Sequence, residues 1–223
     1  MGTLTLTTMR SLIRAALNES STTSITNTEL NAAINDGYKD VCAKTGCYEK
    51  LITIPNIASG VRLVPLTYAA VSNYVMRVNY VEYYKTTSDT PYGYGLPQVY
   101  PQTFGHMPID TYVPQFWFQW GNYLSIETVP DVATYDIYVY AACYPSTVLS
   151  GDSDLPSCAP AEFHEAIWFF ATAFIAMKLK RWADCAVFYN KYIDSIQPRK
   201  YEYVMKFPEG RVYHDLPANV SYS

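Results

Sequence analysis

The sequence predicts an α+β protein, with helices near both ends of the chain and antiparallel strands between them. In residues 7–18, 26–46 and 160–196, apolar side chains recur at spacings of three and four, as on one face of a helix. Between residues 48 and 144, short segments instead alternate or stand between prolines and glycines, which is typical of strands and turns. Strands segregated between helices favour α+β over a parallel βαβ sheet.

The expected architecture is a helical bundle formed by the N- and C-terminal helices, with an antiparallel β-sandwich or barrel insertion and an extended C-terminal tail. A chain of 223 residues usually forms one domain. The strands are therefore expected to be an insertion into the helical domain. The expected boundaries are 1–47 for the N-terminal helices, 48–146 for the β insertion, 147–196 for the C-terminal helix pair and 197–223 for the tail.

The N-terminal helices follow from caps and apolar spacing. The first is expected over residues 7–18, capped by Thr7 or Thr8. The second begins at a capping box, in which Thr26 bonds the backbone three residues on and Glu29 reaches back. It carries an apolar stripe from Leu30 to Cys42 and is expected to stop at Gly46.

The middle of the chain predicts five or six strands. Short strands are expected at 51–54 and 61–64, and longer ones at 74–84 and 135–144. Residues 116–128 read as a hairpin around Gly121-Asn122. Residues 86–105 hold proline and glycine but almost no aliphatic side chains, and predict a long loop.

A C-terminal helix pair is predicted from residue 160 to residue 196. Pro160 suits a helix start, and acidic residues follow it in the first turn. The expected buried stripe of the first helix is Phe163, Ile167, Phe170, Ala171, Phe174 and Met177, with Trp168, Phe169 and Ile175 beside it. One face of the second helix is expected to carry Ala183, Ala186, Val187, Asn190 and Ile193. We take this pair as the frame on which the preceding elements pack.

The tail, residues 197–223, lacks a sustained period but keeps several aromatic and basic side chains. It is too apolar for a solvated linker, which favours a segment that becomes ordered on a partner.

Composition excludes several protein classes. The net charge is −4 and no run of Lys or Arg exists, whereas a nucleic-acid reader normally shows a basic patch. The longest apolar run lies within residues 166–177, shorter than the about 20 residues that span a membrane. We expect neither a secretion signal nor N-myristoylation at the start of the chain. Five scattered cysteines predict reduced thiols, read more simply as small buried side chains than as metal ligands.

Tyrosine is unusually frequent, with 22 residues in the chain. Tyrosine favours strands, and it also favours protein interfaces because its ring can be buried while its hydroxyl stays wet. Both interpretations stay open.

No motif predicts catalysis, a cofactor or a metal. Residues 163–165, Phe-His-Glu, begin like a zinc-protease helix, but Trp168 stands where the second histidine is required. His164 is therefore read as a locally hydrogen-bonded residue. Residues 152–154, Asp-Ser-Asp, lack the glycine and distal glutamate of a calcium loop, so a connecting turn is favoured. Glu127 and Asp131 flank a turn without marking a catalytic pair.

Three segments in order resemble the head-to-tail adaptor (connector) proteins of tailed bacteriophages. The first is the opening helix followed by Thr26-x-x-Glu29-Leu30-x-x-Ala33-Ile34-Asn35-x-Gly37-Tyr38. The second is the late strand pattern, 124–130 then 135–144, and the third is Leu155-Pro156 with Pro160-x-Glu162-Phe163-His164 before the final helix pair. Together they cover about two-thirds of the chain, and the match departs over residues 86–116.

The resemblance implies a structural virion protein at the head–tail junction, made in the host cytoplasm, with neither catalytic residues nor a cofactor. It implies a homo-oligomeric ring, expected to be a dodecamer, seated beneath the portal protein and docking a tail or neck protein. DNA would pass through the lumen without sequence recognition. The tail is expected to reach the portal, and the hypothetical portal-binding residues are Arg199, Lys200, Tyr201, Tyr203, Phe207, Arg211 and Tyr213.

Two other functions remain open. The chain could be another neck or tail component, or a carbohydrate- or receptor-binding module that uses its tyrosine-rich strands. It could also be a hydrolase with a site assembled from scattered residues, which would need a buried carboxylate or histidine with a strongly shifted pKa in a pocket.

Overall fold

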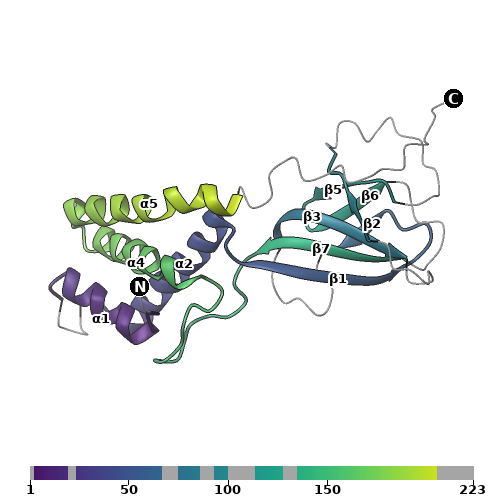
Figure 1. The fold of residues 1–223 in the computed structure, drawn as a ribbon. Helices are drawn as coiled ribbons and strands as arrows, with labels where there is room; N and C mark the ends of the chain where they lie inside the picture. Colours follow the sequence, from purple (N-terminus) through teal and green to yellow (C-terminus); the bar gives the residue numbers. More distant parts are fainter. Residues whose placement is uncertain are drawn as a thin grey trace. The chain divides into compact units, whose positions relative to one another are not determined.

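The computed structural model describes residues 3–19, 24–66, 75–85, 93–99, 114–127 and 135–204. Over these residues the chain is a mixture of α-helices and antiparallel sheets, which confirms the predicted α+β class (Figure 1). The elements in chain order are α1 (Leu6–Ala16), α2 (Asn27–Thr45), β1 (Glu49–Ile57), β2 (Leu63–Pro65), β3 (Val75–Lys85), β4 (Gly93–Leu96), β5 (Phe116–Trp120), β6 (Tyr123–Glu127), β7 (Tyr135–Cys143), the 3-10 turn η1 (Ala161–Phe163), α4 (His164–Lys178) and α5 (Trp182–Val204).

The chain divides into two compact units. The helical unit includes the chain up to Lys50 and again from Ala142 to Val204, and the strand unit includes most of the sheet residues. In the helical unit α1, α2, α4 and α5 pack side by side (Figure 1). Their shared core includes Leu6, Met9, Ile13, Leu30, Ile34, Tyr38, Phe163, Ile167, Ala171 and Tyr192.

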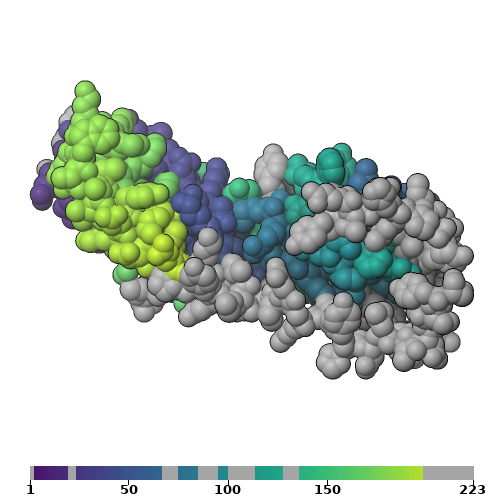
Figure 2. Space-filling model, turned by 90° about the horizontal axis from the view of Figure 1, so that it is seen from above, coloured from purple at the N-terminus to yellow at the C-terminus, as the bar shows by residue number. Residues whose placement is uncertain are grey.

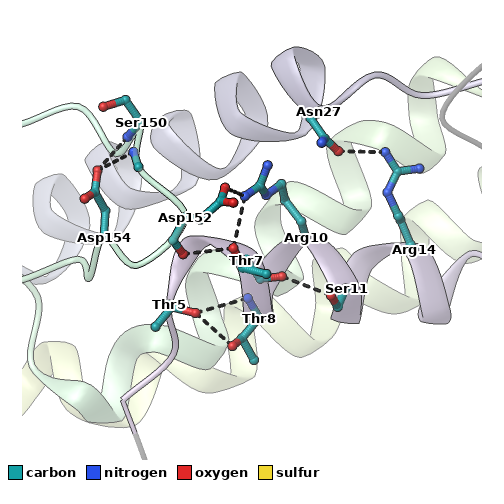
Figure 3. Close-up of polar contacts among 11 residues, drawn as sticks. Thr5, Thr7, Thr8, Arg10, Ser11, Arg14, Asn27, Ser150, Asp152 and Asp154 are labelled. Carbon is teal, nitrogen blue, oxygen red and sulfur yellow. Dashed lines mark hydrogen bonds and ion pairs between the residues drawn. The ribbon is translucent and has the colours of Figure 1, made fainter.

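The start of α1 is held by the connector that precedes α4. Thr5 caps the helix, accepting a hydrogen bond from the Thr8 N–H at 3.2 Å, so the predicted cap at Thr7 or Thr8 was wrong. Thr7 instead donates its hydroxyl to the Asp152 carbonyl at 2.9 Å, and Arg10 forms an ion pair with the Asp152 carboxylate (Figure 3). Asp154 accepts from the backbone N–H groups of Ser150 and Gly151, which makes residues 150–154 a tied connecting turn.

The predicted capping box of α2 is confirmed. Thr26 Oγ1 accepts from the Glu29 N–H at 3.2 Å, and the Thr26 N–H donates to Glu29 Oε2 at 2.9 Å. Glu29 also pairs with Lys178 of α4, and this hydrogen bond, together with that from Thr26, lowers the pKa of Glu29 to about 2. At the other end Gly46 has φ 65° and its N–H bonds the Cys42 carbonyl, as predicted for the helix stop.

The C-terminal helices differ from the prediction in bounds and in buried face. The first begins with η1, so α4 proper starts at His164, and α5 continues to Val204 where the helix was expected to end at Ile196. In α4 the predicted stripe is only partly buried: Phe174 is 44% and Met177 42% exposed, whereas Ile175 is buried. Among the described side chains of α5, Tyr192 and Ile196 are buried. On the predicted face Ala183, Ala186, Val187 and Asn190 are exposed, and only Ile193 is half-buried against the core.

Gly37 sets the approach of α2 to α4. A Cβ atom at this position would lie 2.8 Å from the Ile167 carbonyl oxygen, which is backbone and can move only with its helix. Gly37→Val is therefore expected to lower the free energy of unfolding by about 1–3 kcal/mol, measured by urea unfolding followed by circular dichroism. Ala32→Val, on the exposed face of the same helix, is the matched control, and equal midpoints for the two variants would contradict this packing.

The strand unit contains a four-stranded sheet, in the order β1-β7-β3-β4, and a three-stranded sheet, in the order β2-β6-β5. The predicted hairpin is confirmed: β5 and β6 pair antiparallel from Phe116 opposite Glu127 to Trp120 opposite Tyr123, around Gly121 at φ 56°. β4 was not predicted, because Gly93–Leu96 lies within the segment expected to be a loop; it pairs antiparallel with β3. Residues 97–99 of that predicted loop are also described, and its other parts, 86–92 and 100–105, lie outside the described residues.

Trp117 connects the two sheets. Its side chain is 1% exposed, and its indole N–H donates to the Leu96 carbonyl of β4 at 2.9 Å. Backbone hydrogen bonds join the same region, from the Trp117 N–H to the Pro97 carbonyl and from the Val99 N–H to the Trp117 carbonyl. The other buried apolar side chains of the strand unit include Ile52, Ile54, Val64, Val81, Phe118, Leu124, Ile126, Ile137 and Val139.

Candidate interaction surfaces

The helical unit carries an exposed apolar groove between α4 and α5. The groove has a volume of about 140 Å³ and is lined by Phe170, Ala173, Phe174, Met177, Cys185 and Tyr189, which we call the α4–α5 surface. Phe174, Met177 and Tyr189 are each more than two-fifths exposed. Both helices lie open on the face of the unit seen in Figure 2, where they are green to yellow. Clustered apolar side chains left in water are typical of interaction sites.

Further aromatic side chains extend beside this surface. Trp182 at the start of α5 is 64% exposed. Trp168, Phe169 and Phe188 form a ring cluster with centroids 4.3–6.3 Å apart, and the Lys191 ammonium lies 5.1 Å from the Phe188 ring. Trp168 and Phe169 are half-buried and also pack against the core, so Trp182 is the exposed member of this group. With the groove, these partly exposed rings make the α4–α5 region a candidate binding face.

A second candidate lies on one face of the four-stranded sheet. We call it the tyrosine face: Tyr80, Glu82 and Tyr84 of β3 with Tyr138 and Tyr140 of β7. The Tyr84 and Tyr138 rings meet edge to face with centroids 4.6 Å apart, and the Tyr80 and Tyr140 rings are 5.7 Å apart. All five side chains are partly exposed, whereas the alternate residues of these strands, such as Val81 and Val139, are buried.

Glu82 organises the tyrosine hydroxyls. The Tyr140 hydroxyl donates to Glu82 Oε2 at 3.3 Å, and the Tyr84 hydroxyl donates to the same oxygen at 3.5 Å. Partial burial, and then the negative charge of Glu82, raise the pKa values of Tyr80, Tyr84 and Tyr140. The hydroxyls therefore stay protonated and remain hydrogen-bond donors at neutral pH. Gly95 of β4 leaves the space that the Tyr80 ring occupies.

The sequence pointed to tyrosine in general but missed Glu82 as the centre of this cluster. The signal was present in the period-two spacing of Tyr80, Glu82 and Tyr84 and of Tyr138 and Tyr140, which places each set on one face of a strand. What the spacing could not show was that β3 and β7 are neighbours.

The residues suggested for portal binding fall at and beyond the end of α5. Arg199, Lys200, Tyr201 and Tyr203 lie in the last turns of the helix, and their role stays a prediction. Phe207, Arg211 and Tyr213 lie outside the described residues. The helix runs through Pro198, whose missing N–H removes one hydrogen bond of the helical ladder and usually bends a helix.

The residues weighed for catalysis make structural contacts. His164 is buried between two backbone groups: the Leu4 N–H donates to its Nδ1 at 3.0 Å, and its Nε2 lies 3.1 Å from the Ala159 carbonyl. Glu127 is buried in β6 and pairs with Arg62 at 3.2 Å; burial raises the pKa of Glu127 and Arg62 acts against that rise. Asp131 lies outside the described residues. Where the structure describes the chain, histidine, cysteine and carboxylate groups nowhere gather in threes to hold a metal ion.

His164 predicts a pH dependence of stability. Nδ1 accepts from Leu4, so the imidazole is neutral with its proton on Nε2, and burial lowers the pKa of His164 below its usual 6.5. As the pH falls, the imidazole binds a second proton in the unfolded chain before it does so in the folded protein. The contribution of His164 to the free energy of unfolding is therefore full above about pH 6.5 and decreases as the pH falls below that value. We expect the melting temperature to fall across this window. The melting temperature of His164→Asn, which keeps an acceptor for Leu4 but cannot titrate, should fall less. Identical pH profiles of the melting temperature in the variant and the wild type would contradict the assignment.

The comparisons with known proteins point in one direction. Residues 4–204 match the sequence model of a protein family described as SU10 adaptor protein. The matched region contains every described helix and strand, from the start of α1 at Leu6 to the end of α5 at Val204. No protein with a curated functional description matches the sequence. Within the described ranges, none of the helices has the length and apolarity needed to cross a membrane.

Proposed function

This chain belongs to the SU10 adaptor protein family, a family of phage head-to-tail adaptors, and from that premise we propose that it forms a ring beneath the portal, extends the DNA channel and docks the tail. Membership makes it a structural protein of the phage particle. The observation that carries the proposal is the family match over residues 4–204, because it covers the helices and the strands together. In this proposal the helices of both termini act as one bundle and the strands are its insertion.

The α4–α5 surface supports self-association. In a ring each subunit contacts the next through two different patches, so each patch must be exposed in the single chain. Phe174, Met177 and Tyr189 meet that requirement, and burying them against a neighbouring copy would remove their apolar area from water. A twelve-membered ring is the expected size. Its lumen would pass DNA without reading sequence, which suits a chain whose net charge is −4 and that shows no run of basic residues.

The segment after Ile196 is the proposed portal contact. This segment follows directly on Ile196, which is 4% exposed and belongs to the core of the helical unit. The side chains proposed to bind are Arg199, Lys200, Tyr201, Tyr203, Phe207, Arg211 and Tyr213. The aromatic residues would anchor in apolar pockets, and the basic residues would pair with acidic groups of the portal.

Mass in solution tests the proposed ring. Light scattering of the purified protein, alone and with purified portal protein, should show a defined ring on the portal. A protein whose mass is unchanged by the portal would count against the proposal and favour the binding-module function below.

Truncation is expected to separate folding from portal binding. Removing residues 197–223 should abolish portal binding and leave the melting temperature of the protein nearly unchanged, because the described core residues of the helical unit, up to Ile196, all remain. Removing only residues 205–223 keeps α5 whole and should weaken binding less, since four of the proposed residues remain. Co-sedimentation with the portal measures both variants. If the protein that lacks residues 197–223 binds the portal as well as the full-length protein does, the assignment of the contact to this segment is overturned.

The tyrosine face favours a second candidate, a carbohydrate-binding neck or tail protein. Tyrosine rings can stack on the apolar faces of sugar rings, and hydroxyls fixed by Glu82 can bond sugar hydroxyl groups. Glycan-array binding that Tyr84→Ala and Tyr138→Ala remove would support this function. If no glycan on the array binds, the carbohydrate-binding function is excluded and the adaptor function remains.

A further inference from the structure

Two cysteines meet at the turn that leads from α2 into β1. Cys42 lies in the last turn of α2, and Cys47 follows Gly46, the residue that ends the helix in the left-handed conformation. The Gly46 N–H bonds the Cys42 carbonyl at 2.9 Å, and this turn brings the flanking side chains together. The two Sγ atoms are 4.0 Å apart, and both residues are free thiols.

The simplest role of this contact is packing, because at helix ends of this kind a side chain in the last turn often contacts the second residue beyond the helix. Two features go beyond packing. The pair combines a fully buried thiol, Cys42, with a partly exposed one, Cys47, so only Cys47 can meet a reagent from solution. The turn is also held in place: the Cys47 N–H donates to Thr45 Oγ1 at 3.3 Å, and the Thr45 hydroxyl donates to the Val41 carbonyl at 2.7 Å.

The two thiols differ in acidity. The hydrogen bond with Cys42 lowers the pKa of the Cys47 thiol, and the same contact together with burial raises the pKa of Cys42. A more acidic, more accessible thiol reacts first in exchange, and a nearby second thiol resolves the product.

We propose that Cys42 and Cys47 are a reversible disulfide site that closes on contact with a small-molecule disulfide. The Cys47 thiolate attacks one sulfur of the reagent, forms a mixed disulfide and releases one thiolate. The Cys42 thiol then loses its proton and attacks Cys47 Sγ, which releases the second thiolate. One disulfide is reduced to two thiols while two protein thiols are oxidised to one disulfide. Closing the bond requires the sulfurs to approach from 4.0 Å to about 2.05 Å.

The bond would lock the turn between α2 and β1. It closes a short loop, so the expected gain is modest, a rise in melting temperature of roughly 4–8 °C. A protein made in a reducing cytoplasm and carried in a released particle would assemble as the dithiol and be oxidised afterwards. This timing rests on the proposed function, whereas the bond itself does not.

Peptide mapping of the full-length protein tests the site. After incubation with oxidised glutathione and alkylation of the remaining thiols, the peptide that contains residues 42 and 47 should have lost two hydrogen atoms and resist alkylation. Cys42→Ser and Cys47→Ser should each abolish this product, and Cys185→Ser, which alters a thiol elsewhere, should not. Pairing of Cys47 with Cys158, or a glutathione adduct on Cys47 that persists, would overturn the proposal.

Thermal unfolding tests the lock. The oxidised wild-type protein should melt higher than the reduced protein, and dithiothreitol should reverse the shift. The shift should be absent in both serine variants and retained in Cys185→Ser. A bond that forms without any shift would overturn the locking role, and because neither assay uses the portal, failure here is distinguishable from failure of the adaptor function.

Discussion

Replacing both Phe174 and Met177 by glutamate is expected to leave the protein monomeric in the presence of portal while its melting curve stays close to that of the wild type. In the single chain these side chains are 44% and 42% exposed, so the carboxylates can remain in water. In the proposed ring they would be buried without partners, which costs several kcal/mol. Losing two apolar anchors, at about 2 kcal/mol each, alone weakens subunit association by about a thousandfold.

Leu63→Glu is the matched control for this experiment. Leu63 of β2 is 53% exposed, similar to the two helix residues, but it lies outside the α4–α5 surface. Light scattering with portal should therefore show normal assembly for this variant. A double glutamate variant that assembles as well as the wild type would exclude the α4–α5 surface from the ring interface.

Trp117→Ala is expected to cause the largest loss of stability in the strand unit, about 3–5 kcal/mol in the free energy of unfolding. The indole is 1% exposed, and its removal leaves a cavity between the sheets. It also leaves the Leu96 carbonyl without the indole N–H that donates to it at 2.9 Å. Urea unfolding of the purified protein measures the effect.

Two variants separate the causes of that loss. Trp117→Phe keeps most of the ring but cannot donate to Leu96, so it should lose about 1–3 kcal/mol. Trp120→Ala removes the same side-chain type from the same strand where it is 65% exposed, and should change the free energy of unfolding by less than about 0.5 kcal/mol. Similar losses at positions 117 and 120 would mean that the cavity argument is wrong.

Local signals in the sequence were sufficient for several elements. The capping box at Thr26 and Glu29, the stop at Gly46 and the hairpin around Gly121 depend on residues a few positions apart, and all three are confirmed. The order of motifs along the chain also indicated the adaptor family, which the match over residues 4–204 confirms. Such features can be predicted from the sequence because the groups that form them are close together in the chain.

The buried faces of α4 and α5 could not be predicted in the same way. α4 is apolar on nearly every side, so a period of 3.6 residues marks no single stripe as the inner one. In the structure α4 packs against α1, α2 and α5, and the positions of these helices decide which of its sides is covered. Ile175 is buried as a result, and Phe174 is exposed. The candidate surface for assembly therefore includes Phe174 and Met177, which the sequence alone placed on the buried stripe.

What the sequence by itself determined is the class of the fold, the ends of α2, the β5–β6 hairpin and the family to which the chain belongs. Only the tertiary structure decided that Asp152 contacts Thr7 and Arg10 of α1, that Gly93–Leu96 pairs with β3, and that Tyr84 and Tyr138 meet beside Glu82. Each of these contacts joins segments that are separated along the chain or lack a periodic signal of their own. Their free energy comes from packing and hydrogen bonds between distant residues, which local spacing does not encode.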